Sequence, residues 1–280
     1  MLDTTAVRPV AADDLPQVRA LLARDPVLDV FVGSRVHGSG LSASRLGGEL
    51  WGYRDGGRLV SLCYSGANLV PVGATPAAVP MFADLAARKG RRCSSIVGPA
   101  AAVLGMWDHL QSTWGPAREV RSRQPVLAIS DTPAVRPDPR VRRVRVDEID
   151  RLLPASIAMF TEEVGVSPLG NDNGAYYRAR VSELVRSGRA FAWFENGEVV
   201  FKAEIGAATP LACQVQGVWV RPDRRGEGLA AGGMAAVIEY ALRDVAPTIS
   251  LYVNDYNVAA RATYRRVGFR EVGTFATVLF

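Results

Sequence analysis

A glycine-rich turn flanked by arginines is the stretch of sequence best suited to chemistry. It runs Arg225-Gly226-Glu227-Gly228-Leu229-Ala230 and follows an apolar segment that ends at Val220. Glycine lets successive backbone N–H groups converge without Cβ obstruction, and the N-terminus of a following helix adds further free donors. The pattern predicts an anion cradle suited to a pyrophosphate. Two glycines can also serve only to make a tight turn between a strand and a helix.

The elements around this turn belong to an α/β fold with a mixed sheet. A strand over Cys213–Val220 precedes the turn, and a helix from about Leu229 to Val245 follows it. Asn196-Gly197 joins two apolar runs as a type I′ hairpin turn would. The expected order of the second half is strand, two helices, three strands, helix, strand, helix, and two final strands, "FREVG" and "TFATVLF".

The composition along the chain and a weak internal repeat predict two domains. Ser130–Val144 has three prolines and no apolar periodicity, which indicates an extended linker. We place the boundary near residue 136, giving domains of residues 1–136 and 137–280. Both halves begin with a Val/Arg strand and an acidic helix start, a weak repeat that suggests a duplicated fold.

Composition excludes several classes of function. The chain has 280 residues and a net charge of +5, with scattered arginines, so we expect no nucleic-acid partner. No apolar run approaches the roughly 20 residues of a membrane helix, and the N-terminus lacks a signal-peptide pattern. Three distant cysteines and two histidines predict a cytoplasmic protein with reduced thiols and no metal site.

Two motifs, in order, resemble the GNAT superfamily of acyl-CoA-dependent N-acyltransferases. The first is Val218-Trp219-Val220-Arg221-Pro222 continuing through Ala230, which is similar to the family's V-x-V-x-P-x-x-R-G-x-G-x-G/A. The second is L-x-V-x-x-x-N-x-x-A-x-x-x-Y-x-x-x-G-F, here running from Leu251 to Phe269. The resemblance covers about residues 141–280 and implies the GNAT fold, in tandem with a degenerate first copy.

The resemblance implies a coenzyme A site and assigns residues to it. The pyrophosphate would be held by Arg225 and by the amides of Gly226, Gly228, Leu229 and Ala230. The backbone of Val218 and Val220 would pair with the pantetheine arm, and Asn257 would hydrogen-bond it. Tyr264 would lie near the sulfur and protonate the leaving thiolate. Its spacing also fits a core aromatic on an amphipathic helix, and Asn257 also fits a helix N-cap.

Several carboxylates compete to accept the proton of an amine substrate. Glu204 lies on a strand where many GNAT enzymes keep a base, but Lys202, two residues away, offers an ion pair instead. Glu162 and Glu163 end a helix in the region that shapes the acceptor pocket in this family, or form a solvated helix end. We also expect the α-carboxylate of Phe280 to be held by an apolar strand and to face the acceptor cleft.

These expectations combine into one function with two alternatives. The chain is expected to be an acetyl-CoA-dependent N-acetyltransferase that passes acetyl directly to the primary amine of a small molecule or peptide, with oligomeric state left open. The first half has no Arg-x-x-Gly-x-Gly/Ala turn after a strand, so it would pack, wall the cleft or recognise the acceptor. The alternatives are an aminoacyl or longer-chain acyl transferase of tandem type, and a non-catalytic acyl-CoA-binding regulatory module.

Overall fold

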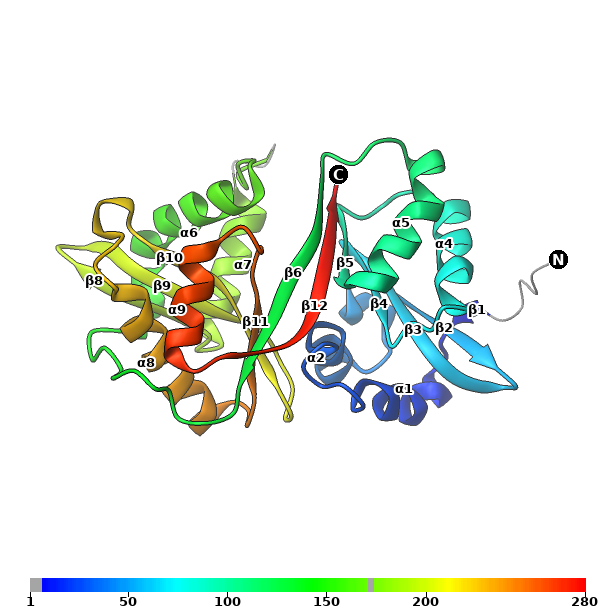
Figure 1. The fold of residues 1–280 in the computed structure, drawn as a ribbon, viewed down its shortest axis with the longest axis horizontal. Helices are drawn as coiled ribbons and strands as arrows, with labels where there is room; N and C mark the ends of the chain where they lie inside the picture. The colour runs from blue at the N-terminus through cyan, green and yellow to red at the C-terminus, as the bar shows by residue number, and fades with distance from the viewer. Residues whose placement is uncertain (1–6, 171–173) are drawn as a thin grey trace. The chain divides into compact units, whose positions relative to one another are not determined.

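The chain folds into two compact units. The computed structural model describes residues 7–170 and 174–280 (Figure 1). The first unit contains the chain through Leu127 together with Tyr252–Asn257 and Glu271–Phe280, and the second contains Ala128–Leu251 and Val258–Arg270. The boundary expected near residue 136 therefore lies close to the first crossing, at Leu127, but the last ten residues group with the first unit.

The first unit begins with a strand and helices and ends with helices that alternate with strands. Its elements are β1 (Val7–Pro9), α1 (Leu15–Leu22), α2 (Val30–Ser39), α3 (Ala43–Leu46), β2 (Gly48–Asp55), β3 (Arg58–Gly66), β4 (Asn68–Val72), α4 (Ala78–Lys89), β5 (Ser95–Pro99), α5 (Ala100–Trp114) and β6 (Glu119–Ile129). A short 3-10 helix over Ala12–Asp14 leads into α1.

The C-terminal strand β12 (Arg270–Leu279) completes the sheet of the first unit. Phe275 to Leu279 pair antiparallel with Pro99 to Ser95 of β5. Ala276 and Val278, both fully buried, join the core formed beneath α4 and α5, while a second core packs α1 and α2 on other side chains of β2, β3 and β4. "FREVG" and "TFATVLF" are thus one strand rather than the expected two, and burial against β5 decides where it pairs.

The second unit repeats this plan. Its elements are β7 (Arg142–Arg143), a 3-10 turn (Val146–Glu148), α6 (Ile149–Val164), α7 (Ala175–Arg186), β8 (Ala190–Glu195), β9 (Glu198–Ala208), β10 (Cys213–Val220), a 3-10 turn (Pro222–Arg224), α8 (Leu229–Asp244), β11 (Ile249–Tyr252) and α9 (Val258–Val267). The predicted hairpin turn is confirmed, because Asn196 and Gly197 both have positive φ, 51° and 85°.

The two units share one topology. Each has the order strand, helices, three strands, helix, strand and helix, and in each the strands lie in that same order across the sheet. Within β1–β5, the fourth and fifth strands, β4 and β5, pair in parallel over two residue pairs. Within β7–β11, the fourth and fifth strands, β10 and β11, do the same. The weak sequence repeat therefore corresponds to a repeated fold.

The expected linker packs onto the second unit. The Ala134 N–H donates to Val267 O (2.8 Å), and the Asp138 N–H donates to Gly232 O (3.0 Å). Because its backbone groups are bonded to α8 and α9, this segment is part of the fold rather than an extended linker. The strand expected over Val141–Val146 shortens to β7, two residues that pair with β8. Among the described residues, no helix has the length and apolarity needed to cross a bilayer.

One prediction concerns the packing of α8 on β9. A Cβ built on Gly233 would lie 2.7 Å from the ring of Phe201, which is fully buried. Gly233→Ala is expected to lower the free energy of unfolding by about 1–3 kcal/mol, because the close-packed ring cannot move aside. Urea unfolding measures this. Gly38→Ala in α2, where the new Cβ meets no heavy atom within 4 Å, is the control and should be neutral or stabilising. Equal losses would contradict the packing argument.

Candidate active site

Strand β10 presents a free backbone edge beyond its first two residues. Within the described residues its ladder with β11 covers Cys213–Ile249 and Gln214–Ser250, whereas β10 continues to Val220. The Arg221 N–H donates to Val200 O of β9 (2.9 Å). Because successive residues of a strand point their N–H groups to opposite edges, the Val220 N–H faces away from β9. The free edge therefore offers backbone groups to an extended ligand.

A bulge at Gly217 shapes this edge over a buried ion pair. The register of β10 with β9 shifts between Gln216 and Trp219, and Gly217 has a φ of 60°. Lys202 Nζ donates to Gly217 O (3.1 Å) and to Glu204 Oε1 (2.6 Å), and the two charged side chains are 0% and 6% exposed. A buried pair of this kind is strongly destabilised when one partner is removed. The ion pair, which was the alternative interpretation of Glu204, is what the structure contains.

The glycine turn opens directly into helix α8. Gly226 and Gly228 have φ values of 85° and 77°, which favour glycine, and Gly228 is the N-cap of α8. A Cβ built on Gly226 would meet no heavy atom within 4 Å, so the turn is open on that side. Arg266 of α9 brings Nη1 to 3.9 Å from the corresponding Gly228 position. The sequence analysis missed Arg266, because no local pattern pairs α9 with this turn.

Arg225 lies across the free edge of β10 and is held by Glu162. Its Nε donates to Val220 O (2.9 Å), and its Nη2 donates to Glu162 Oε2 (2.7 Å). The other oxygen of Glu162 accepts a hydrogen bond from Trp219 Nε1 (3.1 Å). Glu162, which was expected to bind the acceptor, therefore joins α6 to β10 and to the glycine turn. Any anion that uses Arg225 must compete with this carboxylate.

Tyr264 is buried on α9, and the negative charge of Glu163 acts on its hydroxyl. Burial, and then the Glu163 carboxylate, raise the pKa of Tyr264 above its usual value, because both disfavour the phenolate. The Tyr264 hydroxyl is therefore protonated at neutral pH. The ring also makes an edge contact with Phe269, with centroids 5.8 Å apart, so the expected core role is met as well. Asn257 directly precedes α9, and its N–H donates to Asn254 O.

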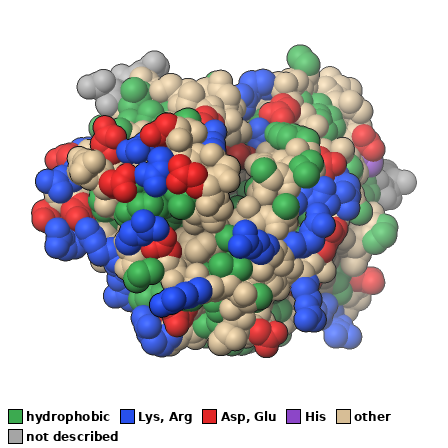
Figure 2. Space-filling view, turned by 60° about the vertical axis from the view of Figure 1, so that its left-hand side comes forward, with side chains coloured by type: hydrophobic (Ala, Val, Ile, Leu, Met, Phe, Trp, Pro, Cys, Tyr) green, Lys and Arg blue, Asp and Glu red, His purple; other side chains and the backbone are tan. Residues whose placement is uncertain are grey.

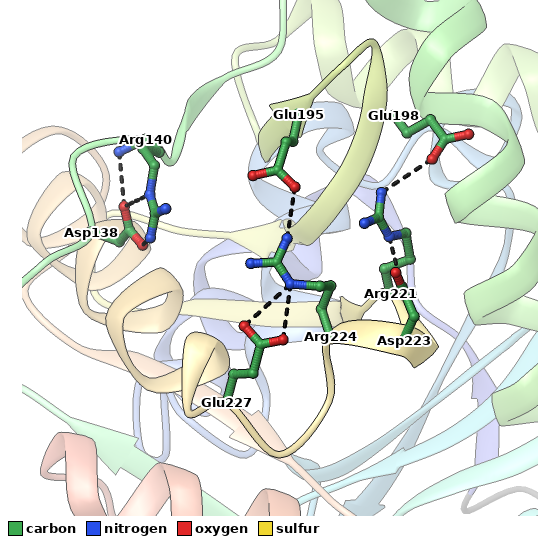
Figure 3. A network of polar contacts seen from close by, with 8 residues as sticks. All are labelled: Asp138, Arg140, Glu195, Glu198, Arg221, Asp223, Arg224 and Glu227. Atoms are coloured by element: carbon green, nitrogen blue, oxygen red, sulfur yellow. Dashed lines mark hydrogen bonds and ion pairs between the residues drawn. The ribbon is translucent and has the colours of Figure 1, made fainter.

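Other arginines near the turn belong to a surface network of ion pairs. Arg224 bonds to Glu227 and to Glu195, and Arg221 bonds to Asp223 and Glu198 (Figure 3). Basic and acidic side chains are interleaved over the face in Figure 2. Arg224 is thus held by two carboxylates and Arg225 by one.

Phe280 is partly buried and packs against the core of the first unit. Its ring makes edge contacts with Trp107 and Trp114, at centroid distances of 5.7 and 5.6 Å, and the Arg91 guanidinium lies 4.7 Å from its centroid. Its N–H donates to Ser94 O (3.1 Å). These aromatic contacts account for the apolar residue that follows β12, and the role of its terminal carboxylate in an acceptor cleft stays a prediction.

The first unit handles the corresponding turn differently. There the strand before the turn, β4, carries Pro71, which has no N–H, and the Thr75 N–H donates to Ser61 Oγ (3.1 Å). Ser61 Oγ in turn donates to Gly73 O (2.9 Å). The backbone groups of this turn are therefore already hydrogen-bonded within the first unit. Among the described residues, no group of three or more His, Cys, Asp or Glu could hold a metal ion.

The buried ion pair yields a stability prediction. Lys202→Met should lower the free energy of unfolding by about 3–5 kcal/mol, because it leaves the Glu204 carboxylate buried without its cation. The double variant Lys202→Met/Glu204→Leu should recover most of this loss, since no uncompensated charge remains. Urea unfolding of the three proteins measures both effects. A double variant as unstable as Lys202→Met would contradict the attribution of the loss to an unpaired buried carboxylate.

Both halves of the chain match known sequence families, and the match of the second unit agrees with its two motifs. Residues 157–269 match the acetyltransferase (GNAT) family, and residues 48–152 match a domain of unknown function, DUF4081. Among curated proteins, none matches the sequence.

Solved structures of similar fold cover nearly the whole chain. A GNAT-family acetyltransferase from Colwellia psychrerythraea is 12% identical with a TM-score of 0.57, covering 98% of this chain and 99% of its own. A GCN5-related N-acetyltransferase from Sphaerobacter thermophilus is 17% identical with a TM-score of 0.59, covering 97% and 93%. A tandem GNAT protein from the clavulanic acid biosynthesis pathway is 16% identical with a TM-score of 0.50, covering 98% of each chain. The chain thus has the GNAT fold, and its residues 157–269 match the acetyltransferase (GNAT) family, whose members transfer acyl groups from acyl-CoA.

Proposed function

We propose that the protein is an acetyl-CoA-dependent N-acetyltransferase that acts on a primary amine. The observation that carries the proposal is the free edge of β10, which leads directly into an open glycine turn at the N-terminus of α8. An extended thioester can pair with such an edge as an added strand while its diphosphate meets the helix N-terminus. The family match over residues 157–269 supports the same use.

The amides that follow the turn and the side chain of Arg225 hold the diphosphate in this proposal. The donors are the backbone N–H groups of Gly226, Gly228, Leu229 and Ala230. The pantetheine arm pairs with Val218 and Val220, so Arg225 exchanges Val220 O and Glu162 for the diphosphate when the cofactor binds. Both side chains of the Arg225–Glu162 pair are about half exposed, so the pair is weak and the exchange is inexpensive.

The reaction is direct transfer with Tyr264 as the proton donor. The amine attacks the thioester carbonyl, whose developing oxyanion accepts a hydrogen bond from the Val220 N–H on the free edge. As the tetrahedral intermediate collapses, the C–S bond breaks and the thiolate takes the hydroxyl proton of Tyr264. The raised pKa of Tyr264 ensures that this proton is present at the start of each turnover.

Glu163 is the carboxylate best suited to the amine. Glu204 is bound by Lys202 inside the sheet, and Glu162 is bound by Trp219 and Arg225. Glu163 is exposed and close enough to Tyr264 to influence its pKa. We propose that its charge attracts the ammonium form of a small-molecule or peptide acceptor and passes the released proton to solvent.

Two arginine variants near opposite ends of α8 test which residues bind the diphosphate of coenzyme A. Arg225→Gln should weaken coenzyme A binding by about tenfold or more, because a charge-assisted contact to the diphosphate is lost. Arg243→Gln removes the same charge near the other end of this 16-residue helix and should leave binding within about twofold. Calorimetry with coenzyme A measures both, and pantetheine, which lacks the diphosphate, should bind both variants alike. Equal weakening of pantetheine would contradict the assignment of Arg225.

The chemical step is tested by removing one hydroxyl. Tyr264→Phe should lower kcat for thiol release from acetyl-CoA by about 10²- to 10⁴-fold while coenzyme A affinity stays unchanged. Tyr53→Phe, the same deletion in the first unit, should leave kcat unaffected. The assay uses acetyl-CoA with a broad panel of primary amines. Tight coenzyme A binding without thiol release from any amine would exclude the enzyme and favour a binding module.

A further inference from the structure

The first unit contains a cavity of about 390 Å³. It lies between the open end of the β2–β3 hairpin, the last turn of α4 and the end of α5. Its apolar wall includes Trp51, Leu69 and Trp114, and its charged side chains are Glu49, Lys89 and Arg92. The volume falls in the range of small-molecule sites, and the mixture of aromatic walls with few polar groups is typical of them.

The acidic side chain of the cavity is already neutralised. Both oxygens of Glu49 accept hydrogen bonds from Lys89 Nζ (3.1 and 2.8 Å), and Oε2 also accepts one from Trp51 Nε1 (2.7 Å). These donors keep the pKa of Glu49 below its usual value, with Arg92 adding to the effect. Glu49 is therefore ionised and occupied, and the charge of the lining is positive once Arg92 is counted.

Glycines keep one wall free of side chains. Gly48 and Gly66 face each other in the β2–β3 ladder and both line the cavity. A Cβ on Gly48 would lie 2.4 Å from Ser65 O, and one on Gly66 would lie 2.3 Å from Tyr64 Oη. Neither position has room for a side chain. This part of the wall is therefore backbone.

We propose that this cavity binds a small organic carboxylate with an apolar, aromatic or branched body. The carboxylate accepts charge-assisted hydrogen bonds from Arg92, and the apolar body packs against Trp51, Leu69 and the ring of Trp114. A neutral ligand would leave the charge of Arg92 unpaired. A cation would be repelled by Lys89 and Arg92, because the carboxylate of Glu49 is already bound by Lys89. The cavity therefore selects for an anion with an apolar portion.

The site is separate from the position of the cofactor turn in the repeated fold. The turn of the first unit, around Gly73 and Thr75, precedes α4, whereas Lys89 of the cavity ends it. A helix of 12 residues is about 18 Å long. The first unit thus carries a ligand site of its own, at the opposite end of α4 from the turn that lost its phosphate pattern.

The test uses the full-length protein and compares three phenyl-bearing ligands: an anionic carboxylate, a neutral amide and a cationic amine. Phenylacetate, phenylacetamide and phenethylamine are titrated by calorimetry and by saturation-transfer NMR, together with indole-3-acetate and hexanoate. Phenylacetate or another of the carboxylates should bind with saturation, and the amide and the amine should bind at least about tenfold more weakly. No saturable binding by any carboxylate, or equal binding of the amide, would overturn the proposal.

Matched variants assign the binding to the cavity. Arg92→Gln, at an exposed position, should weaken binding of the carboxylate about tenfold. Arg88→Gln removes the same charge from the exposed face of α4, outside the lining, and should have no effect. Equal weakening by Arg88→Gln and Arg92→Gln would show only a general effect of charge and would also overturn the proposal.

Discussion

The site of the second unit depends on an ammonium group buried beneath a strand. Lys202 Nζ bonds to Glu204 and to the carbonyl of Gly217, the residue at which β10 shifts register. A charge sealed from water must keep both partners, so the bulge is tied to the interior of the sheet rather than left to the flexibility of glycine. The bulge in turn fixes Trp219, whose indole holds Glu162, and through it Arg225.

The two units show how one topology can carry different chemistry. Both contain a fourth strand that leaves its parallel neighbour after two residue pairs and then enters a turn before a helix. In the second unit that turn is built of Gly226 and Gly228, and its donors remain open. In the first, Pro71 lacks an N–H and Ser61 consumes another donor. Fold alone therefore says little about ligand, and a few residues in one turn decide it.

Sequence reasoning succeeded where the relevant forces are local. The hairpin at Asn196-Gly197, the start of α8 after Gly228 and most helices follow from turn geometry and periodicity. It failed where partners are distant in the chain. Glu162 has its partners 57 and 63 residues away, and nothing in the last ten residues specifies β5 as their neighbour. The cavity walls likewise come from four separate segments of the chain, so no local sequence motif predicts them.

The placement of β12 has a consequence for the order in which the protein matures. Strands β1 to β5 leave the ribosome early, but the strand that pairs with β5 is translated after the entire second unit. Until then Ile96 and its neighbours lack the side chains of Ala276 and Val278 that seal their core. The edge of β5 in the nascent first unit therefore stays unpaired while the second unit is synthesised. That edge is the surface a chaperone would need to shield.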